Sequence, residues 1–147
     1  MSNADLISLY SSRILALAAD IPLTERLTAP QASVKRRAPL CGSTVTVDID
    51  VTGGKISGFG QDVKACALGQ AAASVVGSAI LGSTADQVRS ARDQLKSMLK
   101  DGGPAPDAPF DGLDVLVPAR EYKNRHASIL LALEASVEAL ELLEQPA

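Results

Sequence analysis

The chain has 147 residues, enough for one domain with a substantial hydrophobic core, and 46% of them are hydrophobic. Aromatic residues make up only 3%, so the core has to be built from Ala, Val, Leu and Ile, and few side chains can stack on nucleic-acid bases. The formal net charge is −3 and the sequence pI is about 5.1, which leaves no overall basic footprint for DNA or RNA. We therefore expect no nucleic-acid partner.

The low number of cysteines bears on the cellular compartment in which the protein is expected. No charged-then-apolar signal precedes them, so free or metal-bound thiols in a cytoplasmic protein are expected rather than a secreted disulfide framework. The longest uncharged run, residues 65–85, contains Ser, Gln and Gly, which favours a buried helix over a membrane span. We expect no membrane contact.

The first predicted element is an amphipathic helix over residues 4–20, which ends before Pro22. We expect its apolar stripe to dock on a sheet formed further along the chain. The stripe consists of Leu6, Leu9, Tyr10, Ile14, Leu17 and Ala18.

Residues 21–40 contain three prolines and are irregular, with a first strand predicted at 31–38. This strand contains the basic run Lys35, Arg36 and Arg37. The run has two interpretations: a solvated edge strand, where cations discourage pairing between sheet edges, or a contact for an acidic protein partner. The first is favoured.

A β-hairpin is predicted over residues 44–63, because apolar and polar side chains alternate along its first strand. The Gly53-Gly54 pair suits a tight two-residue turn, and the glycines around Phe59 predict a bulge in the return strand. Asp48 and Asp50 share one strand face. We interpret them as residues of a solvated sheet face, not as paired catalytic carboxylates.

Three helices are predicted after the hairpin. The first begins at Cys66, the second opens with a capping box from Thr84 to Gln87, and the last runs from His126 to about Leu143. A short helical turn is expected within residues 110–117. The three segments therefore place most of the second half of the chain in helices.

Cys41 and Cys66 flank the hairpin, so their thiols are candidates for one shared site. Cys66 opens a helix, where free N–H groups and the helix dipole favour a thiolate. His126 is the only histidine and shares a helix face with Ile129 and Leu130. Thiolate and imidazole suit zinc and iron–sulfur iron, although spacing alone favours a small buried cysteine and a helix-terminal histidine.

Three segments carry recognisable motifs: Cys-Gly-Ser at 41–43, the Gly-Phe-Gly and Lys-Ala-Cys-Ala-Leu-Gly-Gln sequences within 58–74, and Arg-His-Ala-Ser-Ile-Leu at 125–130. They resemble the IscU/NifU N-terminal family of iron–sulfur cluster assembly scaffolds. The resemblance implies one NifU N-terminal-like domain over residues 1–147. It also implies an α+β fold, with a small three-stranded antiparallel sheet packed against several helices.

The resemblance further implies a carrier rather than an enzyme. Cys41, Cys66 and His126 match family positions that hold a [2Fe–2S] cluster, iron or zinc, and the protein would pass the metal or sulfur to acceptors. Implied partners are a cysteine desulfurase and apo iron–sulfur acceptor proteins. Two alternatives are a zinc-bound sulfur-transfer accessory of the desulfurase and a divergent family member that acts through protein contacts.

Two positions depart from the family pattern. Ser43 stands where the family usually has Asp, and Ala127 stands where a third cysteine is expected. In a register shifted by one residue, as in the branch where a basic residue precedes the cysteine, His126 itself replaces the third cysteine. A two-iron cluster needs four terminal ligands, so the three matched residues leave one ligand position to be filled. An outside ligand, a second subunit in a homodimer or an oxygen donor such as Ser43 would fill it.

Overall fold

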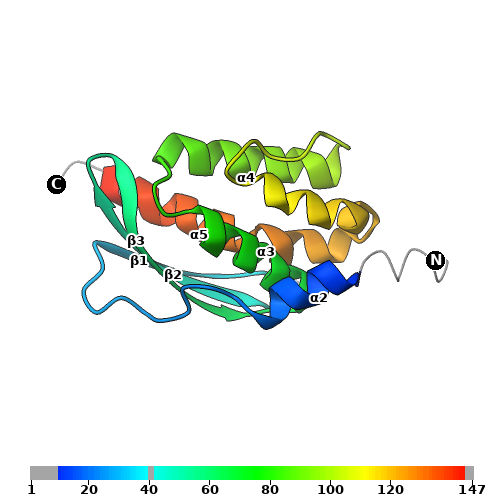
Figure 1. Ribbon diagram of the computed structural model, residues 1–147, viewed down its shortest axis with the longest axis horizontal. Coiled ribbons are helices and arrows are strands. Elements are labelled where there is room, and N and C mark those ends of the chain that lie inside the picture. Colours follow the sequence, from blue (N-terminus) through cyan, green and yellow to red (C-terminus); the bar gives the residue numbers. More distant parts are fainter. Residues whose placement is uncertain (1–9, 40–41, 145–147) are drawn as a thin grey trace.

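The computed structural model describes residues 10–39 and 42–144, and its centre is a three-stranded antiparallel sheet. The strands β1 (Ala32–Arg37), β2 (Thr44–Thr52) and β3 (Lys55–Lys64) lie in sequence order, with β2 in the middle. Helices cover one face of this sheet (Figure 1). The predicted α+β fold is therefore confirmed.

The hairpin forms as the sequence predicts. The Gly53-Gly54 pair makes the two-residue turn with φ values of 61° and 78°, which residues with side chains rarely adopt. The predicted bulge is also present. Asp50 pairs with Gly58 while Val51 pairs with Ile56, so one extra residue of β3 lies between the two pairs.

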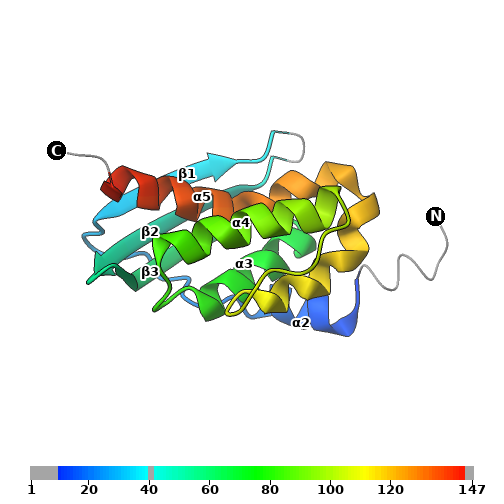
Figure 2. The same cartoon turned by 90° about the horizontal axis from the view of Figure 1, so that it is seen from above.

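The helices form two layers over the sheet (Figures 1 and 2). Helices α3 (Ala67–Ala79) and α5 (His126–Glu144) form the inner layer, and α4 (Ala85–Lys100) lies above them. The 3-10 segments η1 (Asp111–Glu121) and η2 (Lys123–Arg125) connect α4 to α5, so the predicted helical turn is longer than expected. Within the described chain, no helix is both long and apolar enough to cross a membrane.

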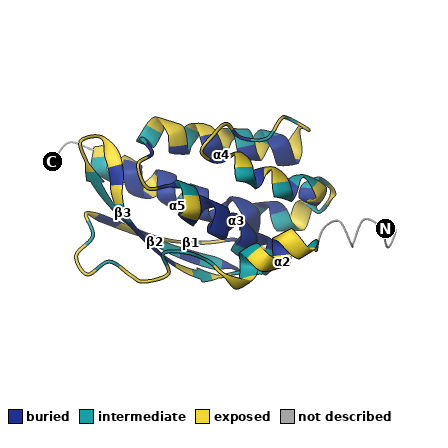
Figure 3. Ribbon diagram, viewed as in Figure 1, coloured by how far each residue is buried: buried dark blue, intermediate teal, exposed yellow. Residues whose placement is uncertain are grey.

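Helix α5 is sandwiched between the sheet and α4, so most of its surface is buried (Figure 3). Its apolar stripe is buried, Glu138 and Glu141 are exposed, and Glu134 is half-buried beside Arg36 and Arg92; the stripe consists of Ile129, Leu130, Leu133, Val137 and Leu140. The capping box of α4 is also confirmed, because Thr84 accepts from the Gln87 N–H and Gln87 accepts from the Thr84 N–H. Local sequence patterns thus predicted these helices well.

The N-terminal helix differs from its prediction. Its described part, α2 (Ser12–Ala19), is capped by Ser11, and residues 4–9 of the predicted helix lie outside the described residues. Helix α2 packs on α3, not on the sheet (Figure 1). The reason is that α3 and α5 already cover the inner face of the sheet, leaving α3 as the surface on which Ile14 is buried.

Asp48 is buried, which corrects the expected solvated sheet face. Residues 21–31 cross the outer face of the sheet, and Asp48 accepts hydrogen bonds from Arg26 Nε at 2.6 Å, the Leu27 N–H at 3.0 Å and Ser33 Oγ at 2.7 Å. Burial by itself would raise the pKa of Asp48, but these hydrogen bonds outweigh it and lower the pKa. Asp48 therefore fastens the loop to the sheet.

Candidate functional site

The starts of α3 and α5 meet at the open end of the hairpin. Thr44, the first residue of β2, pairs with Lys64, the last residue of β3, and Cys66 follows as the N-cap of α3. The two helices approach closely because residue 69 has no side chain. A Cβ added to Gly69 would lie 2.5 Å from Ser128 Oγ of α5.

A chain of polar side chains links Cys66 to Ser43. The Cys66 sulfur lies 3.7 Å from Ser128 Oγ, which donates to Ser43 Oγ at 3.0 Å. Cys66 is a free, half-buried thiol, and both serines are buried. A serine hydroxyl can rotate, so Ser128 can accept from a thiol or donate to a thiolate.

His126 is anchored at the other side of the α5 N-terminus. Its Nε2 lies 3.0 Å from the carbonyl oxygens of both Ala119 and Arg120, and the residue is buried. Carbonyl oxygens only accept, so Nε2 carries a proton. In the neutral ring, Nδ1 then holds the lone pair available to a metal.

Cys41, the third predicted ligand, lies outside the described residues. The described residues on either side of it are joined by hydrogen bonds: the Ala38 N–H donates to the Ser43 carbonyl at 2.8 Å, and the Gly42 N–H donates to the Ala38 carbonyl at 3.0 Å. Within residues 10–39 and 42–144, no three His, Cys, Asp or Glu side chains are grouped to hold a metal ion. The ligand set of Cys41, Cys66 and His126 stays a prediction.

Sequence reasoning missed Ser128 as a neighbour of Cys66. The only feature of the sequence that could have indicated a role for Ser128 is its position two residues after His126, in the first turn of the last helix. Ser43 was predicted only as an oxygen donor, and the structure links it to Cys66 through Ser128. Ala127, between the two polar residues, is half-buried and keeps an apolar methyl where a third thiol was expected.

Solved structures share this fold, whereas the comparisons with protein-family models and with curated proteins give no match. An iron–sulfur cluster assembly scaffold protein for the SUF system from Fervidobacterium islandicum is 20% identical, with a TM-score of 0.82 over 91% of this chain and 98% of that one. A hypothetical protein is 19% identical, with a TM-score of 0.81 over 92% and 98% of the two chains. At these identities the likeness shows the fold alone.

A third structure is much more similar in sequence. It is the N-terminal part of a nitrogen-fixing NifU-like protein from Brucella abortus, and its TM-score is 0.95 with 40% sequence identity. The match covers 97% of this chain and 99% of that one, so it includes the hairpin and the starts of α3 and α5. This chain therefore belongs to the NifU-like N-terminal family.

Proposed function

We propose that this protein is an iron–sulfur cluster assembly scaffold, a carrier rather than an enzyme. It binds a [2Fe–2S] cluster, iron or zinc through Cys41, Cys66 and His126, and passes the metal or sulfur to acceptor proteins. One observation carries the proposal: in a chain 40% identical to a NifU-like protein, a free half-buried thiol lies where the hairpin ends and two helices begin.

Cys66 is the central ligand of the proposed site. As the N-cap of α3, it lies beside backbone N–H groups that have no partner within the helix, and such groups favour a thiolate. Ser128 can turn its hydroxyl hydrogen toward that thiolate. Thiolates prefer zinc and iron–sulfur iron over hard cations, which fits the proposed cargo.

His126 would contribute Nδ1 to the cargo. The carbonyls of Ala119 and Arg120 hold the Nε2 proton, so they would fix the ring orientation and the tautomer, as outer partners of metal-binding histidines commonly do. Through these hydrogen bonds η1 becomes part of the proposed site, although none of its residues is a proposed ligand.

Three protein ligands leave one of the four terminal ligand positions of a two-iron cluster unfilled. The fourth would come from the Ser43 hydroxyl, a second copy of this chain or the partner protein. A site with one exchangeable position suits a protein that releases its cargo. We propose that a cysteine desulfurase supplies the sulfur and that apo iron–sulfur proteins accept the product.

The test is iron, zinc and acid-labile sulfide analysis, with an absorption spectrum, on protein purified without oxygen. The variants are Cys41→Ala, Cys66→Ala and His126→Ala. The control is Lys55→Ala, at the turn that closes the other end of the hairpin. Iron with matching sulfide in the wild type and Lys55→Ala, but lost in each of the other variants, is the expected result.

Two other outcomes would change the proposal. Zinc without sulfide, lost in the same variants, would favour the sulfur-transfer alternative, which trapping of a persulfide on Cys66 or Cys41 would then check. Absence of metal after reconstitution with iron and sulfide would contradict both forms and leave a family member that acts through protein contacts.

A further inference from the structure

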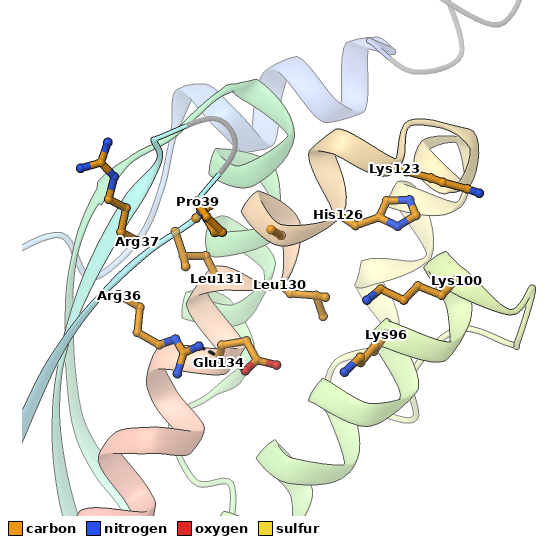
Figure 4. A pocket seen from close by; sticks show the side chains of 12 residues that line it. Arg36, Arg37, Pro39, Lys96, Lys100, Lys123, His126, Leu130, Leu131 and Glu134 are labelled. Atoms are coloured by element: carbon orange, nitrogen blue, oxygen red, sulfur yellow. Dashed lines mark ion pairs between the residues drawn. The ribbon is translucent and has the colours of Figure 1, made fainter.

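Positive charge is concentrated at one pocket, although the whole chain carries a net charge of −3. The pocket lies between β1, α4 and the start of α5 (Figure 4) and has a volume of about 250 Å³. Five of its lining residues are cationic and Glu134 is the one acid among them; the cations are Arg36, Arg37, Lys96, Lys100 and Lys123. An adjoining pocket of about 410 Å³ shares Lys100, Lys123 and His126 and has no acidic lining residue.

The negative charge of Glu134, the one acidic residue that lines this pocket, is already paired with arginines. Glu134 lies 3.9 Å from Arg36 and 3.7 Å from Arg92, and Arg36 also pairs with Glu138 at 3.0 Å. The charge of Glu134 is therefore shared between two arginines, and it does not neutralise the lysines on the other side of the pocket.

The three lysines that line the pocket are not paired with acidic residues in the described part of the chain. Lys96, Lys100 and Lys123 form no ion pair with any residue in the described part of the chain. Lys96 and Lys100 are four residues apart on α4, a spacing at which like charges repel and destabilise a helix. An anion bound between them would remove that repulsion.

Lys96 and Lys100 are directed at one space, whereas the Lys123 side chain points away from them (Figure 4). Figure 4 shows Lys96 and Lys100 extending from α4 toward α5, across the pocket from Arg36. Leu130 and Leu131 of α5 line the same pocket and provide an apolar wall. Protection of a sheet edge can explain cations on β1, but it cannot explain cations on α4 and η2.

We infer that this pocket binds a compact polyanion, a small molecule with two or more carboxylate or phosphate groups, through Lys96 and Lys100, with Lys123 adding positive charge at its edge. Oxyanion groups match the ammonium groups in charge and as hydrogen-bond acceptors. A pocket of about 250 Å³ suits a compact ligand. His126, a proposed metal ligand, and Ala127 also line this pocket. The inference itself needs no bound metal, so metal-free protein tests it separately from the proposed scaffold function.

The test is a titration of the metal-free protein with citrate and with pyrophosphate at constant ionic strength, followed by backbone amide chemical shifts. Sodium chloride and acetate serve as comparison anions. The test variants are Lys96→Gln/Lys100→Gln and, independently of α4, Lys123→Gln. The matched control is Lys35→Gln/Lys55→Gln, which removes the same two charges from exposed strand positions outside the pocket.

We expect saturable shifts around Lys96, Lys100 and Leu130, and an affinity weakened about tenfold or more in Lys96→Gln/Lys100→Gln and by less in Lys123→Gln, with little change in the control. Tighter binding of citrate would indicate a polycarboxylate, and tighter binding of pyrophosphate a phosphate compound. Shifts that do not saturate, or equal weakening in the control, would overturn the inference. So would an oligoglutamate peptide that binds more tightly than both and displaces them, because the occupant would then be a protein segment.

Discussion

The side chains around Cys66 come from distant parts of the chain. Ser128 is 62 residues away in sequence, and Ser43 is 85 residues from Ser128, yet one chain of polar contacts joins all three. The resemblance of the motifs to a known family predicted Cys41, Cys66 and His126 as ligands. No pattern in the sequence indicated that Ser128 would lie next to the thiol, because that contact depends on how α3 and α5 pack.

Ala127 lies where the family pattern has a cysteine, so Ala127→Cys should strengthen metal binding. A third thiolate would add a ligand that zinc and iron prefer, and we expect the zinc dissociation constant to fall about tenfold or more. Competition with a chromophoric chelator measures this constant. Ala79→Cys, which adds a thiol at the other end of α3, is the control; equal tightening in that variant would contradict the prediction.

Asp48 should contribute stability that depends on pH. Its pKa is lowered in the folded state, so the ionised form stabilises the fold above the unfolded pKa of about 4, and this stabilisation is lost as the pH falls through the folded pKa. Asp48→Asn removes the charge from three hydrogen-bonded neighbours and should cost about 2 kcal/mol of unfolding free energy at neutral pH.

Urea unfolding at several pH values measures the effect, and the difference between wild type and Asp48→Asn should shrink below about pH 4. Glu141→Gln removes an exposed carboxylate of α5 that forms no ion pair within the described residues, and it serves as the control. A difference that stays constant down to the lowest pH would mean that the ionised carboxylate is not the source of the stability.

Among the elements, those defined by local patterns were predicted best. The alternation along β2, the Gly53-Gly54 turn and the Thr84 capping box each depend on neighbouring residues, and each is present. The docking of α2 was predicted wrongly, because its stripe shows only that one face is buried and not which surface buries it. The burial of Asp48 was missed for a similar reason, since the loop that covers it has no periodic pattern.

The close approach of α3 and α5 makes residue 69 sensitive to substitution. Gly69→Ala should destabilise the protein by about 1–3 kcal/mol, although alanine is the better helix former. The new methyl group would lie 2.5 Å from Ser128 Oγ and 2.9 Å from the Ala65 Cβ, so the helices would have to separate. Ser78→Ala, at an exposed position of the same helix, should be neutral or slightly stabilising.

Urea unfolding of a double-mutant cycle measures the contribution of the contact. Adding Ser128→Ala to Gly69→Ala removes the atom nearest the new methyl group, so the two substitutions should cost less together than the sum of their separate costs. Additive costs would show that the helix spacing at residue 69 does not depend on Ser128.

In the whole molecule, the proposed ligands belong to three separate segments. Cys66 caps α3, His126 begins α5, and Cys41 lies in sequence between β1 and β2. The sequence could show which helix or loop carries each proposed ligand. The angle between α3 and α5, however, depends on core packing, which the sequence pattern does not show. The same packing sets the basic pocket, whose lysines on α4 and η2 are remote in sequence from Arg36.

The proposed ligands belong to segments that only folding can bring together, so metal bound by them should stabilise the whole domain. Zinc at about 100 times its dissociation constant should add about 2.7 kcal/mol to the unfolding free energy and raise the melting temperature. Differential scanning calorimetry across a zinc series measures this rise, which should grow with the logarithm of free zinc. Cys66→Ala and His126→Ala should abolish most of it, and Lys55→Ala should keep it. An equal rise in Cys66→Ala would mean that zinc binds elsewhere, and that the junction of the hairpin with α3 and α5 is not the metal site.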